Sequence, residues 1–203
     1  MEENMIITIS RQYGSGGSQV AKILAERMGV WCYDRDILTI AAERIGNEEL
    51  TEDTINDLNY KRNDVASAGI TGVMGMGNIP IYNQMFLEQA KIIRKLANYG
   101  SAVFLGRAAD YILKDIKNCT SVYLYADREF RKNRVKEIYG SNAEIMDKEE
   151  KNRADYYNYY TGNRWGDINN YDFAINTSKV SFEEAADLIY RFAKDKQKNL
   201  KDR

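Results

Sequence analysis

The sequence predicts an α/β protein in which helices cover both faces of a parallel β-sheet. Short apolar segments typical of buried strands alternate with segments of helical periodicity along the 203 residues. A glycine-rich turn joins the first apolar segment to the first helical one, and no repeat or proline-rich linker divides the chain. We therefore expect a single domain over residues 1–203, built from right-handed β–α–β units.

The first part of the chain begins with a predicted strand. Residues 5–9 form a short apolar run rich in β-branched side chains, which is typical of a buried strand. After the glycine-rich turn, apolar residues recur at helical spacing until Gly29 ends the helix. Residues 30–33 predict a second strand, and helices are expected over residues 34–45 and 48–62.

The remaining elements follow the same alternation. Residues 83–98 predict a helix, which Gly100 ends. Further strands are predicted over residues 102–105, 121–125 and 173–175, and further helices over residues 127–139, 147–160 and from 181 onward. Two of these helix starts have the spacing of a capping box, Asp147 with Glu150 and Ser181 with Glu184.

Residues 66–80 stand apart from this pattern. They contain four glycines interspersed with valine and methionine, so a long regular helix is disfavoured there. We expect a mobile loop or a surface segment that becomes ordered against a substrate or a second copy of the chain. Because exposed apolar segments often mark interfaces, a homodimer contact is predicted at this segment.

The composition excludes several classes of site and partner. Lys and Arg number 29 against 30 Asp and Glu, so non-specific nucleic-acid binding is not expected. The absence of His excludes histidine-dependent catalytic triads and histidine metal sites. Cys32 and Cys119 are predicted to be buried, reduced thiols. With no signal-peptide pattern and no segment apolar enough to span a membrane, we expect a cytoplasmic protein without a membrane partner.

The glycine-rich turn SRQYGSGGSQ is a candidate phosphate site. Backbone N–H groups at a turn that opens a helix can hold a phosphate. Against the pattern GxxxxGK[ST], Gly16 fits the second glycine and Ser18 the hydroxyl position. Arg11 stands at the first glycine and Gly17 at the lysine, so a phosphate site and a plain tight turn both remain open. Arg11 and Lys22 are the nearby cations that could replace the missing charge.

Polar side chains follow the second and third predicted strands, at the edge where a parallel sheet binds ligands. Asp34 fits a helix N-cap or a ligand contact, and Arg35 fits a substrate-anion clamp or a surface charge. Arg107 is the strongest single candidate for bidentate contact with a phosphate or carboxylate. Asp110 is expected either to hold Mg²⁺ or to pair with Arg107.

Arginines and tyrosines recur at helical spacing in the later helices. One helix face carries Arg128, Arg131 and Arg134, which is typical of a solvated charged face. Another carries Arg153, Tyr156, Tyr157 and Tyr160. These tyrosines are either part of an amphipathic core, or they exclude water from a phosphate that Arg153 reaches.

Several segments together resemble the cytidylate kinase-like proteins, which are related to the nucleoside monophosphate kinases. They are ITISRQYGSGGSQVAKILAERMGVWCYDRDIL, FLGRAADYIL, VYLYADREFRKNRV and ADYYNYYTGNRWGDINNYDFAINTSKVSFEEAADLI. The resemblance implies a P-loop NTPase fold of the nucleoside monophosphate kinase type, with a five-stranded parallel sheet flanked by helices. It further implies a helical NMP-binding region over residues 34–98, a lid-like region over residues 140–168, and transfer of the γ-phosphoryl group of ATP, with Mg²⁺.

The resemblance also implies roles for individual residues. The ATP phosphates would meet Arg11, Gly14, Ser15, Gly16, Gly17 and Ser18, and Ser18 would reach Mg²⁺. The acceptor would meet Arg35 and Arg107, and the catalytic cations would be Arg107, Arg131, Arg134 and Arg153. From their positions after the strands, Asp34 and Asp110 are further candidates for contact with the acceptor. The chain departs from the family at Gly17, where a lysine is expected, and at Ala108, where an aspartate is expected.

Two functions from different classes are consistent with these residues. The first is an ATP-dependent kinase of a nucleoside monophosphate or another small phosphorylated metabolite, a reaction that needs no histidine because it depends on positioning and charge. The second is a nucleotide- or phosphate-binding protein without turnover, used for sensing or assembly. Gly17 favours the second function, and the arginines favour the first.

Overall fold

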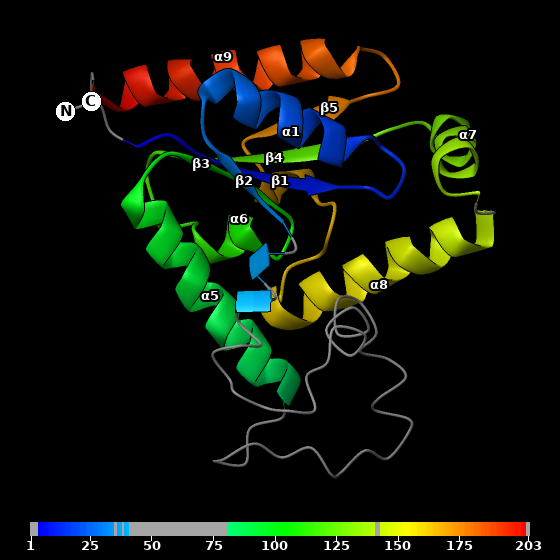
Figure 1. Ribbon diagram of the computed structural model, residues 1–203, viewed down its shortest axis with the longest axis horizontal. Coiled ribbons are helices and arrows are strands. Elements are labelled where there is room, and N and C mark those ends of the chain that lie inside the picture. The colour runs from blue at the N-terminus through cyan, green and yellow to red at the C-terminus, as the bar shows by residue number, and fades with distance from the viewer. Residues whose placement is uncertain (1–3, 35, 38, 41–80, 141–142, 202–203) are drawn as a thin grey trace.

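Five parallel strands in the order β2-β3-β1-β4-β5 form the centre of the protein, as a computed structural model shows (Figure 1). The structure describes residues 4–34, 36–37, 39–40, 81–140 and 143–201. Arg35, the helix expected over residues 48–62 and the glycine-rich residues 66–80 lie outside the described residues. The NMP-binding region expected over residues 34–98 and the lid over residues 140–168 stay predictions.

The five predicted strands are all present. They are β1 (Ile6–Arg11), β2 (Trp31–Tyr33), β3 (Ala102–Leu105), β4 (Cys119–Tyr125) and β5 (Phe173–Asn176). β1 continues two residues beyond the predicted end, because Ser10 and Arg11 pair with Tyr123 and Leu124 of β4. Arg11 is therefore part of the sheet and not of the turn that follows it.

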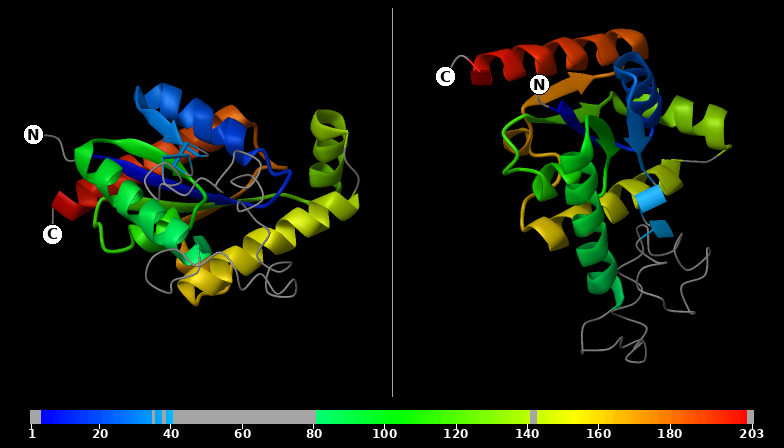
Figure 2. Two further views of the ribbon diagram at one scale, coloured as in Figure 1. Left: turned by 60° about the horizontal axis from the view of Figure 1, so that its bottom comes forward. Right: turned by 60° about the vertical axis from the view of Figure 1, so that its left-hand side comes forward.

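Helices α1 (Gly17–Met28) and α9 (Phe182–Lys201) cover one face of the sheet (Figures 1 and 2). Ile7 and Ile9 of β1 point to this face, where Leu24 of α1 and Ile189 of α9 are fully buried. Each such side chain contributes about 1.5–3 kcal/mol when it leaves water. The burial ties the start of α1, and so the glycine-rich turn, to the sheet.

Helices α5 (Ile81–Tyr99) and α6 (Ala109–Ile112) cover the other face, where Phe104 of β3 packs against Ile93 of α5. Helices α7 (Arg128–Tyr139) and α8 (Ala143–Thr161) lie beyond the carboxyl ends of β1 and β4 (Figure 1). A 3₁₀ turn, η1 (Ile168–Asn170), precedes β5. The helix predicted to end at Gly29 and the helices predicted over residues 83–98 and 127–139 are confirmed, with ends that differ by at most three residues.

Only one of the two predicted capping boxes forms. The Ser181 N–H donates to the Glu184 carboxylate over 2.9 Å, and the Glu184 N–H donates to Ser181 Oγ over 3.1 Å. The prediction at Asp147 is wrong, because α8 begins at Ala143 and Asp147 pairs with Arg128. Its expected partner Glu150 instead accepts a hydrogen bond from a backbone N–H of the glycine-rich turn.

Of the two cysteines predicted to be buried and reduced, neither forms a disulfide, and only Cys119 is fully buried, whereas Cys32 is half-buried. Burial raises the pKa of Cys32 to about 11 and that of Cys119 to about 12, so neither is a ready thiolate. Among the described helices, none has the length and apolar character that a membrane span needs.

Candidate functional site

The turn between β1 and α1 depends on glycine at two positions. Gly14 and Gly16 both have φ +81°, a conformation that other residues rarely adopt. A Cβ on Gly16 would lie 2.4 Å from the Phe182 ring, and one on Gly14 would lie 2.9 Å from the Arg131 carbonyl oxygen. α9 and α7 therefore press directly on the turn and fix its path.

Hydrogen bonds from three distant segments hold this turn. The Ser15 carbonyl accepts from Thr177 Oγ1 over 2.7 Å, after the end of β5. The Tyr13 N–H donates to Glu150 Oε2 of α8 over 2.7 Å. Arg131 of α7 is buried and donates to the Tyr13 carbonyl, with its guanidinium 3.5 Å from Glu150. Arg131, expected to be catalytic, thus contacts the back of the turn.

A pocket lies over this turn, at the N-terminus of α1. Its walls carry Arg11, Arg134 and Arg153, from β1, α7 and α8, together with Gly14, Gly16, Gly17 and Ser18. The first turn of a helix leaves its N–H groups without helical acceptors, so the amides that open α1 are available to an anion. The structure thus brings three of the predicted arginines to the predicted phosphate loop.

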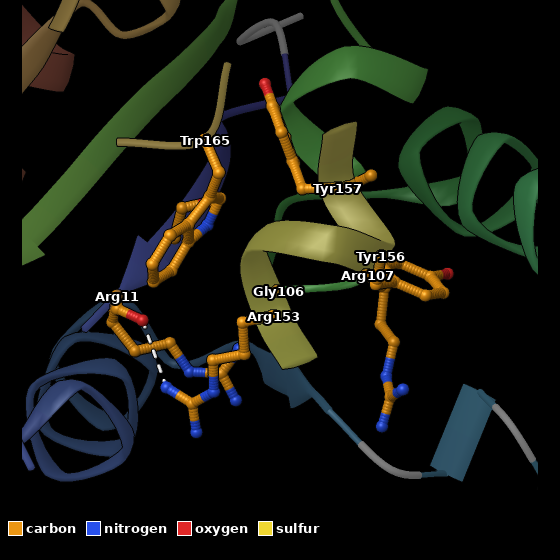
Figure 3. A pocket seen from close by; sticks show the side chains of 9 residues that line it. Arg11, Gly106, Arg107, Arg153, Tyr156, Tyr157 and Trp165 are labelled. Atoms are coloured by element: carbon orange, nitrogen blue, oxygen red, sulfur yellow. Dashed lines mark hydrogen bonds between the residues drawn. The ribbon is translucent and has the colours of Figure 1, made fainter. Parts of the chain in front are cut away.

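A second pocket adjoins the first on the side of β3. Figure 3 shows its lining, which includes Arg11, Gly106, Arg107, Arg153, Tyr156, Tyr157 and Trp165. The side chains of Arg11, Arg107 and Arg153 extend toward the same side of it (Figure 3). Arg11 and Arg153 line both pockets, and Arg153 donates to the Arg11 carbonyl over 3.0 Å. The two pockets therefore meet at these two arginines.

The β3 end has an unusual backbone. Gly106, Arg107 and Ala108 have φ values of +74°, +61° and +53°, three successive left-handed residues. For a residue other than glycine this conformation costs about 1–3 kcal/mol and is concentrated at functional sites. Arg107 is only 7% exposed, so it is more enclosed than an arginine at an open sheet edge is expected to be.

Asp110 belongs to a buried polar cluster behind the second pocket. Its two oxygens accept from Tyr157 Oη over 2.6 Å and from Ser10 Oγ over 3.4 Å. Burial raises the pKa of Asp110, while the Tyr157 and Ser10 hydrogen bonds favour its ionised form. The two roles predicted for Asp110, magnesium binding and pairing with Arg107, stay predictions. The cluster links β1, α6 and α8.

Two acidic residues have roles that the sequence did not reveal. Asp34, expected as an N-cap or a ligand, lies 3.7 Å from the Arg11 guanidinium. Glu150 was assigned to a capping box, and no sequence signal connects it to a turn 137 residues away. Burial raises the pKa of Glu150, and the Tyr13 N–H and Arg131 oppose that rise. Arg35 cannot be placed, since it lies outside the described residues.

The residues present suit a magnesium–nucleotide complex held through its phosphates. Within the described part of the chain, no cluster of three or more Asp, Glu or Cys could hold a metal ion directly. Ser18 is exposed at the first pocket, at the hydroxyl position of the phosphate-loop pattern. Mg²⁺ commonly keeps several waters and binds through substrate phosphates plus one or two protein oxygens, and Ser18 is the residue that could supply such an oxygen here.

Comparisons with known proteins extend these observations. The family model described as cytidylate kinase-like family matches residues 6–179. An uncharacterized protein from Eubacterium ventriosum ATCC 27560 is 29% identical with a TM-score of 0.69, over 94% of this chain and 98% of that one. No curated protein sequence matches the chain.

Two solved kinases share the fold at low identity. A gluconokinase from Sinorhizobium meliloti 1021 is 15% identical, with a TM-score of 0.53 over 96% of this chain and 97% of its own. A shikimate kinase from Acinetobacter baumannii is also 15% identical, with a TM-score of 0.54 over 94% of this chain and 93% of its own. The predicted fold, a five-stranded parallel sheet of the P-loop kinase type, is confirmed.

Proposed function

Because the chain belongs to the cytidylate kinase-like family, we propose that it is an ATP-dependent kinase. It transfers the γ-phosphoryl group of ATP to a nucleoside monophosphate or another small phosphorylated acceptor. The observation that carries this proposal is that two pockets meet at Arg11 and Arg153, one over the phosphate loop and one beyond β3. A donor in the first pocket and an acceptor in the second would have their phosphates at the same two cations.

The first pocket supplies what a triphosphate needs. Bound ATP·Mg²⁺ provides the phosphoryl group and neutralises part of its charge. The backbone amides at Gly16 to Ser18 and the helix dipole of α1 would hold phosphate oxygens, and Ser18, which lines this pocket, would supply a hydroxyl oxygen to the ion. Arg134, whose guanidinium stacks 4.6 Å from the Phe182 ring, adds a positioned positive charge from α7.

The second pocket supports an acceptor that is itself an anion. None of the nine described residues that line it is acidic, and three of them are arginines. An acceptor hydroxyl needs a nearby base to take its proton, whereas an acceptor phosphate is already a nucleophilic anion. Tyr156, Tyr157 and Trp165 provide aromatic surface for an apolar or planar portion of the acceptor and exclude water around the transferring group.

A nucleotide- or phosphate-binding protein without turnover is the second candidate. Two observations favour it: Gly17 stands where the pattern has lysine, and Glu150 takes up the N–H of Tyr13 on the loop. Losing one group that stabilises a transferring phosphate can lower the rate about 10²–10³-fold. The cytoplasmic location and the homodimer expected from the sequence stay predictions under either function.

The two functions differ in product formation. The full chain is incubated with ATP and Mg²⁺ and, in turn, each common nucleoside monophosphate, and ³¹P spectra record ADP and the new diphosphate. If the protein is a kinase, one acceptor should accelerate ADP release well beyond the rate measured without acceptor. Arg153→Ala is expected to lower this rate about 10²-fold or more. The exposed Arg128→Ala on α7 serves as the matched control and should be unchanged.

Tight ATP binding with no product from any acceptor would contradict the kinase proposal and support the second candidate. Equal loss of turnover in Arg153→Ala and Arg128→Ala would show that general charge, and not the shared position of Arg153, determines the rate.

A further inference from the structure

We propose that Arg11 replaces the missing lysine of the phosphate loop, its side chain passing through space that Gly17 and Gly106 leave open. The proposal rests on the kinase or nucleotide-binding function of the same site. It assigns the phosphate-neutralising charge to a residue at the end of β1, six positions before the lysine of the pattern GxxxxGK[ST].

Gly17 and Arg11 compete for one space. A Cβ added to Gly17 would lie 2.6 Å from Arg11 Cγ and 2.7 Å from Arg11 Cβ, closer than real Cβ atoms approach. Arg11 Cβ is attached to a strand residue that pairs with Leu124, so it cannot move away without breaking the sheet register. Any side chain at position 17, lysine included, is therefore incompatible with the observed path of Arg11.

Gly106 provides the second part of that path. A Cβ there would lie 2.1 Å from Arg11 Nη1, so the guanidinium lies directly against the backbone that ends β3. The Arg11 side chain thus starts at β1, passes over the first residue of α1, and ends beside β3. Because Arg11 lines both pockets, we place its guanidinium where they meet.

The guanidinium is buried with few partners of its own. Arg11 is 8% exposed, and its Nε is buried without a hydrogen-bond partner in the described part of the chain. The Asp34 carboxylate lies 3.7 Å from Arg11 Nη2, which is within ion-pair distance but beyond hydrogen-bond length. A buried cation is costly unless it is paired, so an anion that enters either pocket gains a strong partner here.

The sequence shows that a cation and a glycine have exchanged positions in the phosphate-loop pattern. Relative to GxxxxGK[ST], the cation moves from the seventh position to the first, and the glycine moves from the first position to the seventh. Replacing Arg11 by Gly and Gly17 by Lys converts RQYGSGGS into GQYGSGKS, which satisfies the pattern in full. The two departures from the pattern are thus one compensated change, which can be reversed.

The test is a double-mutant cycle on the full chain. The proteins are the wild type, Arg11→Gly, Gly17→Lys, and the double variant, and calorimetry measures the affinity for ATP·Mg²⁺ and for pyrophosphate. Arg11→Gly is expected to weaken both about 10²-fold, as loss of a charge-assisted phosphate contact does. Gly17→Lys alone is expected to lower the melting temperature and the affinity, because its Cβ meets Arg11. The double variant should bind within about tenfold of the wild type.

Two further variants separate the loss of the Arg11 charge from a folding defect and from a general loss of positive charge. Arg11→Met keeps an aliphatic stem over Gly17 and removes the charge, so it should fold and lose affinity even if Arg11→Gly does not fold. Lys22→Ala is the control, because Lys22 is exposed on α1 and does not line the loop pocket. Its affinity should equal that of the wild type.

Each other outcome overturns a specific statement. Normal ATP affinity in both Arg11→Met and Arg11→Gly rejects Arg11 as the substitute and leaves the proposed function standing. Lost affinity that the folded double variant does not recover means that Arg11 shapes the loop and does not stand in for the lysine. A wild type that binds neither ATP nor pyrophosphate refutes the proposed function, and the inference with it.

Discussion

Strands β1 and β3 lie side by side, and each leads at its carboxyl end into an arginine of the candidate site, yet the two arginines are positioned by different means. Arg11 keeps an extended backbone paired with Leu124, and the glycines opposite it clear its path. Arg107 follows β3 with φ +61°, in a backbone that an L-residue rarely adopts. Both are nearly buried, 8% and 7% exposed.

The contrast shows which structural feature each strand end needs to position its arginine. At β1 the glycine at position 17 has no side chain, which leaves room for the side chain of Arg11. At β3 the backbone itself is strained at Arg107 and Ala108, about 1–3 kcal/mol for each residue. The Arg11 arrangement is therefore sensitive to atoms added at Gly17 and Gly106, and the Arg107 arrangement is sensitive to the backbone conformation that positions 107 and 108 can adopt.

The largest expected effect is at Arg107. Arg107→Ala should weaken acceptor use about 10²-fold in kcat/KM, since a bidentate guanidinium contact is lost, and Arg107→Lys should not restore it. Arg107→Gly should lose the same activity but melt at a higher temperature than Arg107→Ala, because glycine relieves the left-handed strain. Steady-state kinetics and thermal melts on the three variants provide the comparison. Unchanged acceptor kinetics in Arg107→Ala would restrict Arg107 to a structural role.

Gly106→Ala tests the point where the two strand ends touch. The new Cβ meets the Arg11 guanidinium and also forces alanine to φ +74°, so we expect a loss of about 2 kcal/mol in stability and tenfold or more in ATP affinity. Gly29→Ala is the matched control, since Gly29 has φ +63° with nothing within 4 Å of its Cβ. It should lose stability only. Equal ATP affinity in both variants would mean that Arg11 moves aside without consequence.

Tyr157→Phe removes the hydroxyl that ties α8 to Asp110, behind both strand ends. A lost hydrogen bond to a buried carboxylate costs about 1.5 kcal/mol. Burial holds the pKa of Asp110 in the folded protein above its ordinary value of about 3.9. The free energy of unfolding that the protonated Asp110 contributes is therefore fully present below about pH 3.9 and is lost as the pH rises through the folded-state pKa. Without the Tyr157 donor the pKa of Asp110 rises further, so the variant should lose more unfolding free energy at pH 7 than at pH 4.

Urea unfolding at the two pH values measures this difference. Tyr159→Phe, at an exposed position of the same helix, is the control and should show no pH-dependent change. A penalty for Tyr157→Phe that is equal at pH 4 and pH 7 would show that Asp110 does not ionise in the folded protein over this range.

The smallest effect is expected at Ala108. Ala108→Gly should stabilise the protein by about 0.5–1 kcal/mol, because glycine adopts φ +53° without the Cβ penalty. Ala109→Gly, one residue later in α6, should destabilise it by a similar amount, since glycine is unfavourable in a helix. Thermal unfolding separates the two signs. If both variants destabilise, Ala108 makes packing contacts that outweigh its backbone strain.

Local patterns were enough to predict most of the described fold. The five strands follow from short apolar runs, and α1, α5, α7 and α9 follow from helical spacing with glycine or capping signals at their ends. The start of α8 was mispredicted, because Asp147 and Glu150 have the spacing of a capping box but stronger partners elsewhere, Arg128 and the Tyr13 N–H. A local motif forms only when no distant group competes for its side chains.

The sequence by itself determined that a glycine-rich turn leads from a buried strand into a helix, and that arginines follow several strands at one sheet edge. Only the tertiary structure decided which of these arginines meet. It places Arg11, Arg134 and Arg153 at the loop, and turns Arg131 to its backbone. Spacing along one chain specifies which face of an element a side chain occupies. Which side chain fills a gap left by a glycine depends on the packing of segments as distant as Arg11 and Gly106, which are adjacent only because β1 pairs with β3.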